Sequence, residues 1–299
     1  MSFATGLKTI VVAADLLGQS GAALEYARKL ATSYGARIVL AHGIDPLDYA
    51  EVDNVPGQVR TGLSEGAREV LDKLTSDLLL EGIHSHSEIR QGAVAQMILD
   101  VTRQYQADLI VIGTKGMKGA GPVVVGAIAE QLVRLAPCPV MAVAADWNAG
   151  DFRPTPGGPV MLAMERNAAA PAAVATAYSL AQTFKRPLLV VHARTAAEAA
   201  ASQNPCAVTA EELGISSSDE VPVRCMVIDG NPADAMAEAI AAHHPCILVA
   251  GVKRTSETPG PHGTAFALLA SSRVPVLCVP PESAIAEHER KAAVPVGAV

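Results

Sequence analysis

Aromatic residues are scarce in this sequence: Phe, Trp and Tyr together make up 3% of 299 residues, and there is one Trp. Hydrophobic residues make up 50% of the chain, and they are therefore mainly aliphatic. Such a composition favours helices packed on a parallel sheet over an aromatic-lined binding groove. The length suits two domains of ordinary size, each able to bury a core.

Positive charge is also low, because 23 Lys and Arg stand against 30 Asp and Glu, for a formal net charge of -7. An acidic chain with scattered basic residues is not expected to bind nucleic acid or an anionic membrane. No apolar run reaches the roughly 18 to 20 residues that cross a bilayer, and the first residues lack the order of a secretory signal. We therefore expect a soluble, cytoplasmic protein.

Cysteine is too sparse and too irregular for a disulfide framework or a zinc site, since five residues include no Cys-x-x-Cys pair. Most of them lie in apolar runs and are interpreted as small core residues. His84 and His86 lie on the same side of an expected strand, which leaves a metal site as an alternative. No third ligand is visible nearby, so two solvated histidines are the preferred interpretation.

An internal repeat is present. Apolar segments at residues 9–15 and 159–165 each end at a carboxylate, 150 residues apart. His42 and His192 end the next apolar runs at the same spacing, and both are expected to hold local structure. Twelve residues are then missing from the second copy, where the first has a loop and a helix from about Thr61.

Later landmarks keep the two copies aligned. Gly113 and Gly251 lie 138 residues apart, as do Gly92 and Gly230, and the proline before each final strand recurs after 136 residues. Each copy alternates five strands with helices, which predicts a parallel sheet covered on both faces.

The expected domains are residues 1–147 and 159–282. A linker rich in turn-forming residues at 148–158 joins them, and a tail at 283–299 begins with a short helix.

A glycine-rich segment follows the fourth expected strand of the first copy, with Gly113, Gly116 and Gly126 in the spacing Gly-x2-Gly-x9-Gly. A strand that leads through such a loop into a helix gathers backbone N–H groups around a phosphate. The segment lacks the Gly-Lys-Ser/Thr of a Walker A loop and the position of a Rossmann fingerprint. The alternative is a turn that only lets the helix pack closely.

On these motifs the chain resembles the universal stress protein family in tandem form, whose nucleotide-binding members carry Gly-x2-Gly-x9-Gly-Ser/Thr after strand four. The resemblance covers both copies and implies two tandem doubly wound α/β domains, each with a parallel five-stranded sheet of the adenine nucleotide alpha-hydrolase-like fold. It implies ATP or another adenine nucleotide, with or without Mg²⁺, as cofactor. The residues that match nucleotide-binding positions are Ala13, Asp15, Gly43, Ile112, Gly113, Thr114, Lys115, Gly116, Gly126, Ala127 and Ile128.

The resemblance assigns the end of strand one to adenosine, Gly43 to adenine and the glycine loop to phosphates. Ala127 departs from the family pattern, because it lacks the hydroxyl that would bond a phosphate. A hydrogen bond to a charged group contributes about 1.5 to 3 kcal/mol, so binding is expected to be weakened, not abolished.

The second copy departs further from the family pattern. Arg254 stands where Gly116 would, Glu257 adds negative charge, and Pro259 and Pro261 remove N–H donors. Gly263 and Thr264 bring back a glycine and hydroxyl pair one residue early, which leaves some ligand binding open. We expect this copy to be a degenerate scaffold.

The resulting hypothesis is a cytoplasmic tandem universal stress protein that binds an adenine nucleotide in its first domain and acts as a stress-response sensor or regulator towards a protein partner. The alternative is a nucleotide-free interaction scaffold. No catalytic triad can be assembled, so no enzyme is expected beyond slow, incidental ATP hydrolysis. The final strands of the two copies are expected to pair at their edges as an intramolecular pseudo-dimer, with a homodimer left open.

Overall fold

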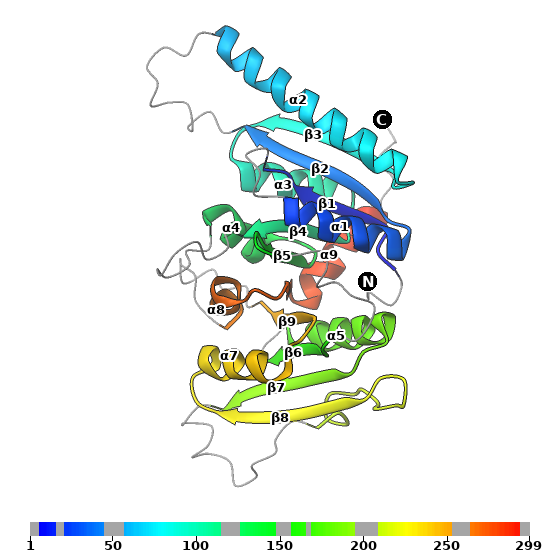
Figure 1. Cartoon of the computed structure of the whole chain (residues 1–299), viewed down its shortest axis with the longest axis vertical. Coiled ribbons are helices and arrows are strands. Elements are labelled where there is room, and N and C mark those ends of the chain that lie inside the picture. The colour runs from blue at the N-terminus through cyan, green and yellow to red at the C-terminus, as the bar shows by residue number, and fades with distance from the viewer. Residues whose placement is uncertain are drawn as a thin grey trace.

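The structure, a computed structural model, describes residues 6–15, 21–44, 57–114, 126–147, 157–165, 169–194, 209–252 and 264–293. Its strands form one ten-stranded sheet in the order β3-β2-β1-β4-β5-β10-β9-β6-β7-β8 (Figure 1). The first half comprises β1 (Thr9–Ala13), α1 (Gly21–Tyr34), β2 (Arg37–Ile44), α2 (Gly57–Leu80), β3 (Ser85–Gln91), α3 (Val94–Gln104), β4 (Leu109–Thr114), α4 (Ala127–Leu135) and β5 (Val140–Ala144). The second half comprises β6 (Val160–Met164), α5 (Ala170–Phe184), β7 (Leu188–Arg194), β8 (Val223–Asp229), α7 (Pro232–His243), β9 (Ile247–Gly251), α8 (Thr264–Ser271), β10 (Val276–Val279) and α9 (Glu282–Ala293).

Strand register confirms the internal repeat. Ile10 lies opposite Leu109 in the first half, and the residues at the expected spacings, Val160 and Ile247, lie opposite each other in the second. Every such pair within a half is parallel, with the order 3-2-1-4-5 in each. The doubly wound fold predicted for both copies is therefore correct.

The two halves join through β5 and β10, which pair antiparallel with Met141 opposite Leu277. This confirms the expected pairing of the final strands. Because the pair is antiparallel, the carboxyl edges of the two half-sheets face opposite ways. A ligand site at the carboxyl edge of one half is thus remote from the same edge of the other.

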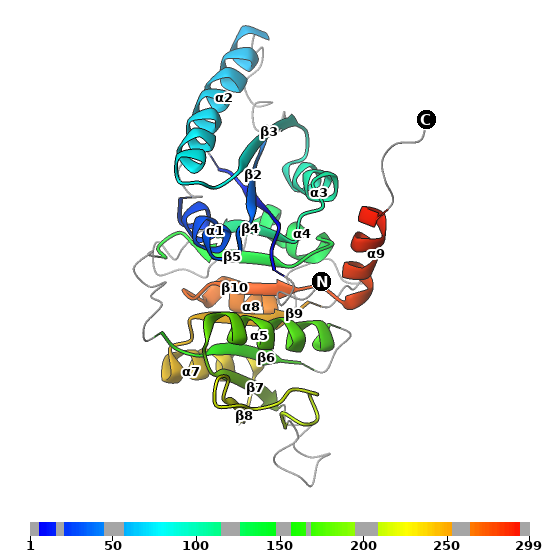
Figure 2. The ribbon, with the colours of Figure 1, turned by 90° about the vertical axis from the view of Figure 1, so that its right-hand side faces the viewer.

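Helices cover both faces of the sheet, and each layer runs across both halves. The layer with α1, α2 and α5 shares one apolar cluster, and the layer with α3, α4, α7 and α8 shares another. In the first half, α1 and α2 lie on one side of the strands and α3 on the other (Figure 2). Tyr26 of α1 is fully buried and packs edge-on against Trp147, with ring centroids 5.1 Å apart.

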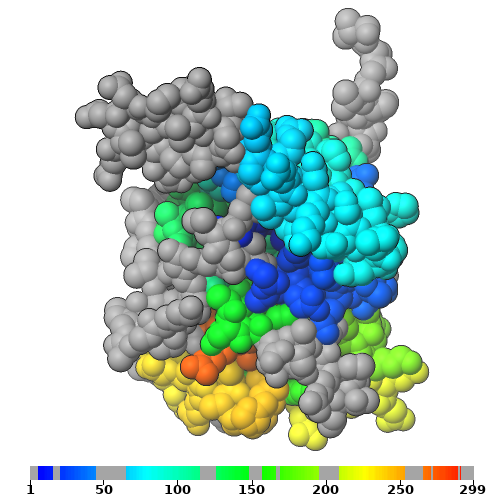
Figure 3. Space-filling model, turned by 45° about the horizontal axis from the view of Figure 1, so that its top comes forward, coloured from blue at the N-terminus to red at the C-terminus, as the bar shows by residue number. Residues whose placement is uncertain are grey.

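Helix α2 begins at Gly57, four residues before the expected start, and its surface lies against α1 (Figure 3). Arg28 of α1 is joined to Glu81, just beyond the end of α2, at 3.1 Å. In the described part of the second half, a turn near Leu213 and Ile215 packs against the same layer instead. This is where the second copy is shorter.

The expected terminal helix is present as α9, and it returns to the first half (Figure 2). Its Ala284 is buried, and His288 Nε2 lies 3.1 Å from the Ala107 carbonyl oxygen before β4. His244 takes the left-handed C-cap position of α7, as expected for the end of that helix.

The described residues contain neither a helix that could cross a membrane nor a disulfide. None of the helices in these ranges is long and apolar enough to cross a bilayer. The described cysteines are free thiols, and Cys138 and Cys278 are buried core residues. Burial raises the pKa of both thiols, which keeps them protonated and unreactive.

Candidate functional site

The strand order places a topological switch point between β1 and β4 of the first half. From β1 the chain crosses through α1 to β2 on one side, while β4 pairs on the other. In doubly wound sheets, ligands bind outside the carboxyl ends of the strands at this point. The carboxyl edge between β1 and β4 is therefore the candidate site.

Most of the predicted nucleotide-binding residues meet at this edge. Half-buried Ala13 ends β1 and exposed Asp15 follows it, and Gly43 lies near the end of β2. Residues 112–114 end β4, and Gly126, Ala127 and Ile128 begin α4. Lys115 and Gly116 lie outside the described residues.

The β1–β2 ladder stops at this edge. The last rung is the bond from Ala14 N–H to the Ala41 carbonyl, at 2.9 Å. The Ala14 carbonyl oxygen lies 2.8 Å from Nδ1 of His42. In a parallel ladder Gly43 presents its N–H and C=O on the same side as Ala41, towards β1, and neither group has a partner among the described residues.

Packing favours a glycine at position 43. A Cβ atom there would lie 2.9 Å from Cε of Met97 and 3.0 Å from Cγ2 of Val94. The first turn of α3 therefore fills the space where a side chain would be. What Gly43 offers a ligand is its backbone, and in the second half Ala193 occupies the equivalent position.

The start of α4 presents backbone donors that find no acceptor within the helix. Gly126 is the N-cap and has no side-chain capping bond, and its carbonyl accepts from Glu130 N–H at 3.0 Å. The N–H groups of Ala127 and Ile128 have no acceptor within the helix, and both residues are exposed. The helix dipole adds partial positive charge there, so this end of α4 suits an anionic group.

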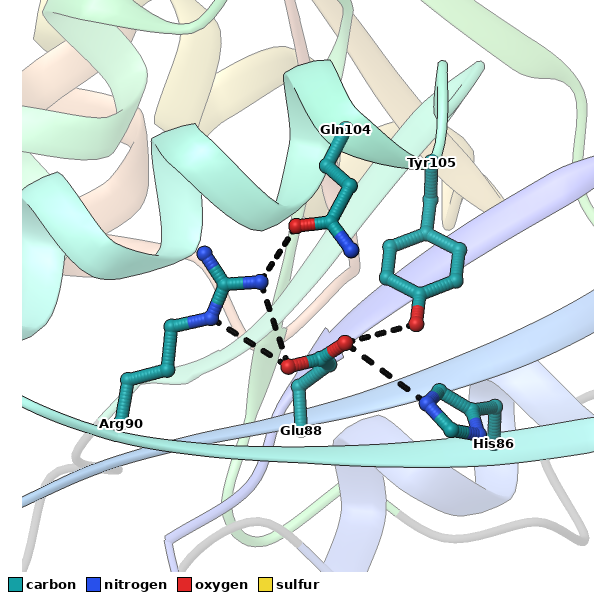
Figure 4. A network of polar contacts seen from close by, with 5 residues as sticks. All are labelled: His86, Glu88, Arg90, Gln104 and Tyr105. Atoms are coloured by element: carbon teal, nitrogen blue, oxygen red, sulfur yellow. Dashed lines mark hydrogen bonds and ion pairs between the residues drawn. The ribbon is translucent and has the colours of Figure 1, made fainter.

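A polar network on β3 and α3 was not anticipated from the sequence (Figure 4). Glu88 accepts a hydrogen bond from the Tyr105 hydroxyl at 2.6 Å and two from Arg90 at 3.2 Å. Arg90 also donates to Gln104, and His86 Nε2 lies 3.6 Å from Glu88. The alternating polar residues of β3 were the signal, but their partners, Gln104 and Tyr105, lie at the end of α3 and directly after it.

Burial, hydrogen bonds and neighbouring charges shift the pKa values of Glu88 and Tyr105. Burial acts to raise the pKa of Glu88, but the bonds from Tyr105 and Arg90 outweigh it and hold that pKa below its usual range. Burial and the adjacent carboxylate raise the pKa of Tyr105 to about 12. No group of three or more His, Cys, Asp or Glu in the described ranges could hold a metal ion. His86 belongs to this network instead.

At the equivalent edge of the second half, two described residues, Ala169 and Val252, are apolar and buried. Ala169, which is 1% exposed, lies so close to Gly251 that a Cβ on the glycine would be 3.0 Å from the Ala169 Cβ. Val252 occupies the position equivalent to Thr114 and is 2% exposed. Its N–H donates to the Val279 carbonyl at 2.8 Å. The departures expected at residues 254–261 lie outside the described residues.

Fold and site together define the class, a tandem of two doubly wound α/β domains joined edge to edge. The sequence profile of the universal stress protein family matches residues 6–144, the first half. A universal stress protein of Thermus aquaticus is 30% identical over 139 residues, which cover 98% of that protein and 46% of this chain. One from Mycolicibacterium smegmatis is 29% identical over 190 residues, 63% of its length and 61% of this chain. The chain belongs to the universal stress protein family.

Solved structures resemble both halves together. A universal stress protein from Archaeoglobus fulgidus superposes with a TM-score of 0.71 at 16% identity, covering 91% of this chain and 98% of that one. A putative universal stress protein from Pseudomonas aeruginosa gives 0.64 at 19% identity and covers 97% and 99%. The fold of nearly the whole chain is thus shared with these two structures.

Proposed function

We propose that the first half binds one adenine nucleotide at the carboxyl edge between β1 and β4, and that the second half is a scaffold without this ligand. In this proposal the chain is a cytoplasmic stress-response sensor or regulator. The nucleotide would act by stabilising one arrangement of the surface around the site, which a protein partner reads.

The backbone of Gly43, whose N–H and C=O have no partner among the described residues, is the observation that carries the proposal. The N–H and C=O of Gly43 form an adjacent donor and acceptor facing the site. Adenine presents an acceptor, N1, beside a donor, the 6-amino group, so the two edges are complementary. Guanine presents the opposite order and is disfavoured, because its donor and acceptor would each meet a like group.

Phosphate groups would lie at the start of α4, where Ala127 and Ile128 supply N–H groups from an exposed helix end. The missing hydroxyl at Ala127 lowers the affinity by roughly one to two decades. Micromolar to millimolar binding is therefore expected. No residue is assigned a catalytic role, and any hydrolysis of ATP should be slow and no faster than in a Gly113→Val variant.

The test is calorimetric titration of the whole chain with ATP, ADP and AMP, with GTP as the control for base recognition. Denatured protein is also analysed by chromatography for released nucleotide. Saturation at one adenine nucleotide per chain supports the proposal. Asp15→Ala should weaken binding, whereas Glu165→Ala, the equivalent change in the second half, should not.

A protein that is purified empty and shows no thermal shift with millimolar adenine nucleotide would refute the proposal. The nucleotide-free scaffold would then be the remaining interpretation. Equal affinity for GTP would refute the assignment of Gly43 to adenine.

A further inference from the structure

We propose that Val94, in the first turn of α3, is a ligand-binding residue whose side chain packs against one face of the adenine base. This inference rests on the proposed function for its ligand. It deepens that function by naming the apolar group that would recognise the face of the base, in addition to the backbone that would recognise its edge.

One layer of side chains reaches the carboxyl edge on the α3 side of the sheet. Ala13 ends β1 in this layer and is half-buried against the apolar cluster beneath α3. Gly43 continues the same layer on β2, two residues beyond the buried Ala41. At the edge, these two strands therefore contribute only a methyl group and a hydrogen atom to the layer.

Val94 supplies the larger apolar group at this place. Its Cγ2 and Cγ1 would be 3.0 and 3.1 Å from a Cβ atom on Gly43, so its methyl groups lie in the direction that a side chain of β2 would take. Val94 is half-buried and packs against the same apolar cluster as Ala13. Because part of its surface stays exposed at the carboxyl edge, it can contact a ligand as well as the protein.

The orientation of the base follows from its two hydrogen bonds. The N–H and C=O of one strand residue point within the plane of the sheet, side by side along the strand. A base that pairs with both groups of Gly43 therefore lies close to that plane, and its faces point towards the two helix layers. Helix α3 packs over β1 and β2, so the face on that side meets Ala13 and Val94.

The second half differs in this layer. Ala193 brings a methyl group where the first half has the glycine hydrogen, and Ala163 near the end of β6 is buried. Pro232 opens α7 at the position equivalent to Val94. Position 232 therefore provides a matched control at an edge to which no nucleotide is assigned.

Two substitutions separate the apolar contact from the fold of the helix. Val94→Thr keeps the shape of the side chain and replaces one methyl group with a hydroxyl, which weakens contact with the face of the base. Val94→Pro installs the residue of the second half and keeps an apolar side chain. Proline suits the first position of a helix, and the N-cap Ala93 has φ −57° and ψ 115°, which a residue before proline can adopt.

The experiment uses the full chain with labelled valine methyl groups. Nuclear Overhauser effects from adenine H2 and H8 to the Val94 methyl groups are measured at saturating AMP, and we expect to observe them. Calorimetry gives the dissociation constants for AMP, ADP and ATP. Val94→Thr should raise all three by the same factor, about three- to tenfold, because the phosphates do not touch this side chain.

Three controls separate contact with the base from a change in the shape of the site. Binding of inorganic tripolyphosphate should be the same in Val94→Thr and the wild type. Val94→Pro should bind AMP within about twofold of the wild type. Pro232→Thr should leave the affinity for AMP unchanged.

If AMP binds but gives no Overhauser effect to Val94, or if Val94→Thr leaves the dissociation constants unchanged, the inference is wrong and the proposed function stands. An equal loss of affinity for AMP and tripolyphosphate also overturns the inference, because Val94 would then act through the shape of the site. A wild type that binds no adenine nucleotide refutes the proposed function, and this inference with it.

Discussion

Met141 and Leu277 lie opposite each other in the antiparallel pair that joins β5 to β10, and both side chains are fully buried. Apolar clusters continue across this junction on both faces of the sheet, with Leu30 of α1 and Leu180 of α5 in the same cluster. Two units that could each be a domain therefore share one core.

Leu277→Ala should lower the free energy of unfolding by about 2 to 5 kcal/mol, because it removes buried methyl groups and leaves a cavity between the halves. Urea unfolding followed by circular dichroism measures this. Leu135→Ala, at a side chain 49% exposed, is the control and should change it by less than about 0.5 kcal/mol. A single transition is expected for the wild type, and two separated transitions would contradict a shared core.

Gly43→Ala should destabilise the chain by about 1 to 3 kcal/mol, since the new Cβ meets Met97 and Val94 at 3.1 Å or less. The second half carries Ala193 with Ala235 at the positions equivalent to Gly43 and Met97. The double variant Gly43→Ala, Met97→Ala should therefore lose less stability than the two single changes added together. A double-mutant cycle by chemical unfolding measures the difference, and additivity within about 0.3 kcal/mol would argue against the contact.

Glu88→Gln should cost about 1 kcal/mol of stability at pH 7, because a carboxylate with three hydrogen-bond donors becomes an amide. The native pKa of Glu88 is lowered, so its contribution is present above the unfolded pKa and is lost as pH falls through the native one. The difference between variant and wild type should shrink below about pH 4. Asp100→Asn, which changes an exposed ion pair with Arg103, is the control and should have little effect at either pH.

Ala127→Ser should strengthen binding of the nucleotide tenfold or more, because it adds a hydroxyl donor at the start of α4. Thr264→Ala, which removes the nearest equivalent hydroxyl of the second half, should leave both affinity and stoichiometry unchanged. Calorimetric titration measures both quantities. A fall from two sites to one on Thr264→Ala would show that the second half also binds the nucleotide.

Much of the fold could be predicted because the repeat ties positions together. Spacings of 150, 138 and 136 residues between the two copies are the spacings at which strand pairs recur. The pairing of the final strands followed from their place at the edge of each predicted sheet. The start of α2 was misplaced by four residues, since helix ends depend on local bonds that periodicity does not show.

The site was predictable in outline and not in detail. Gly43 was expected near adenine, and it lies at the carboxyl edge of the sheet. The sequence did not show that Val94 and Met97 leave little room for a Cβ atom at this position. His42 was expected to hold local structure, and in the folded chain its Nδ1 contacts the Ala14 carbonyl oxygen. These contacts join residues that are far apart in the chain, and no pattern along it records them.

By itself the sequence determined the alternation of strands and helices, the two copies and the family they resemble, because burial periodicity and glycine positions are local properties. Tertiary structure decided which of the described backbone groups at the carboxyl edge have no partner among themselves, how Glu88 and Tyr105 meet, and how closely Ala169 approaches Gly251. Those features depend on which strands become neighbours and how closely helices approach them, and only the packed chain sets these distances.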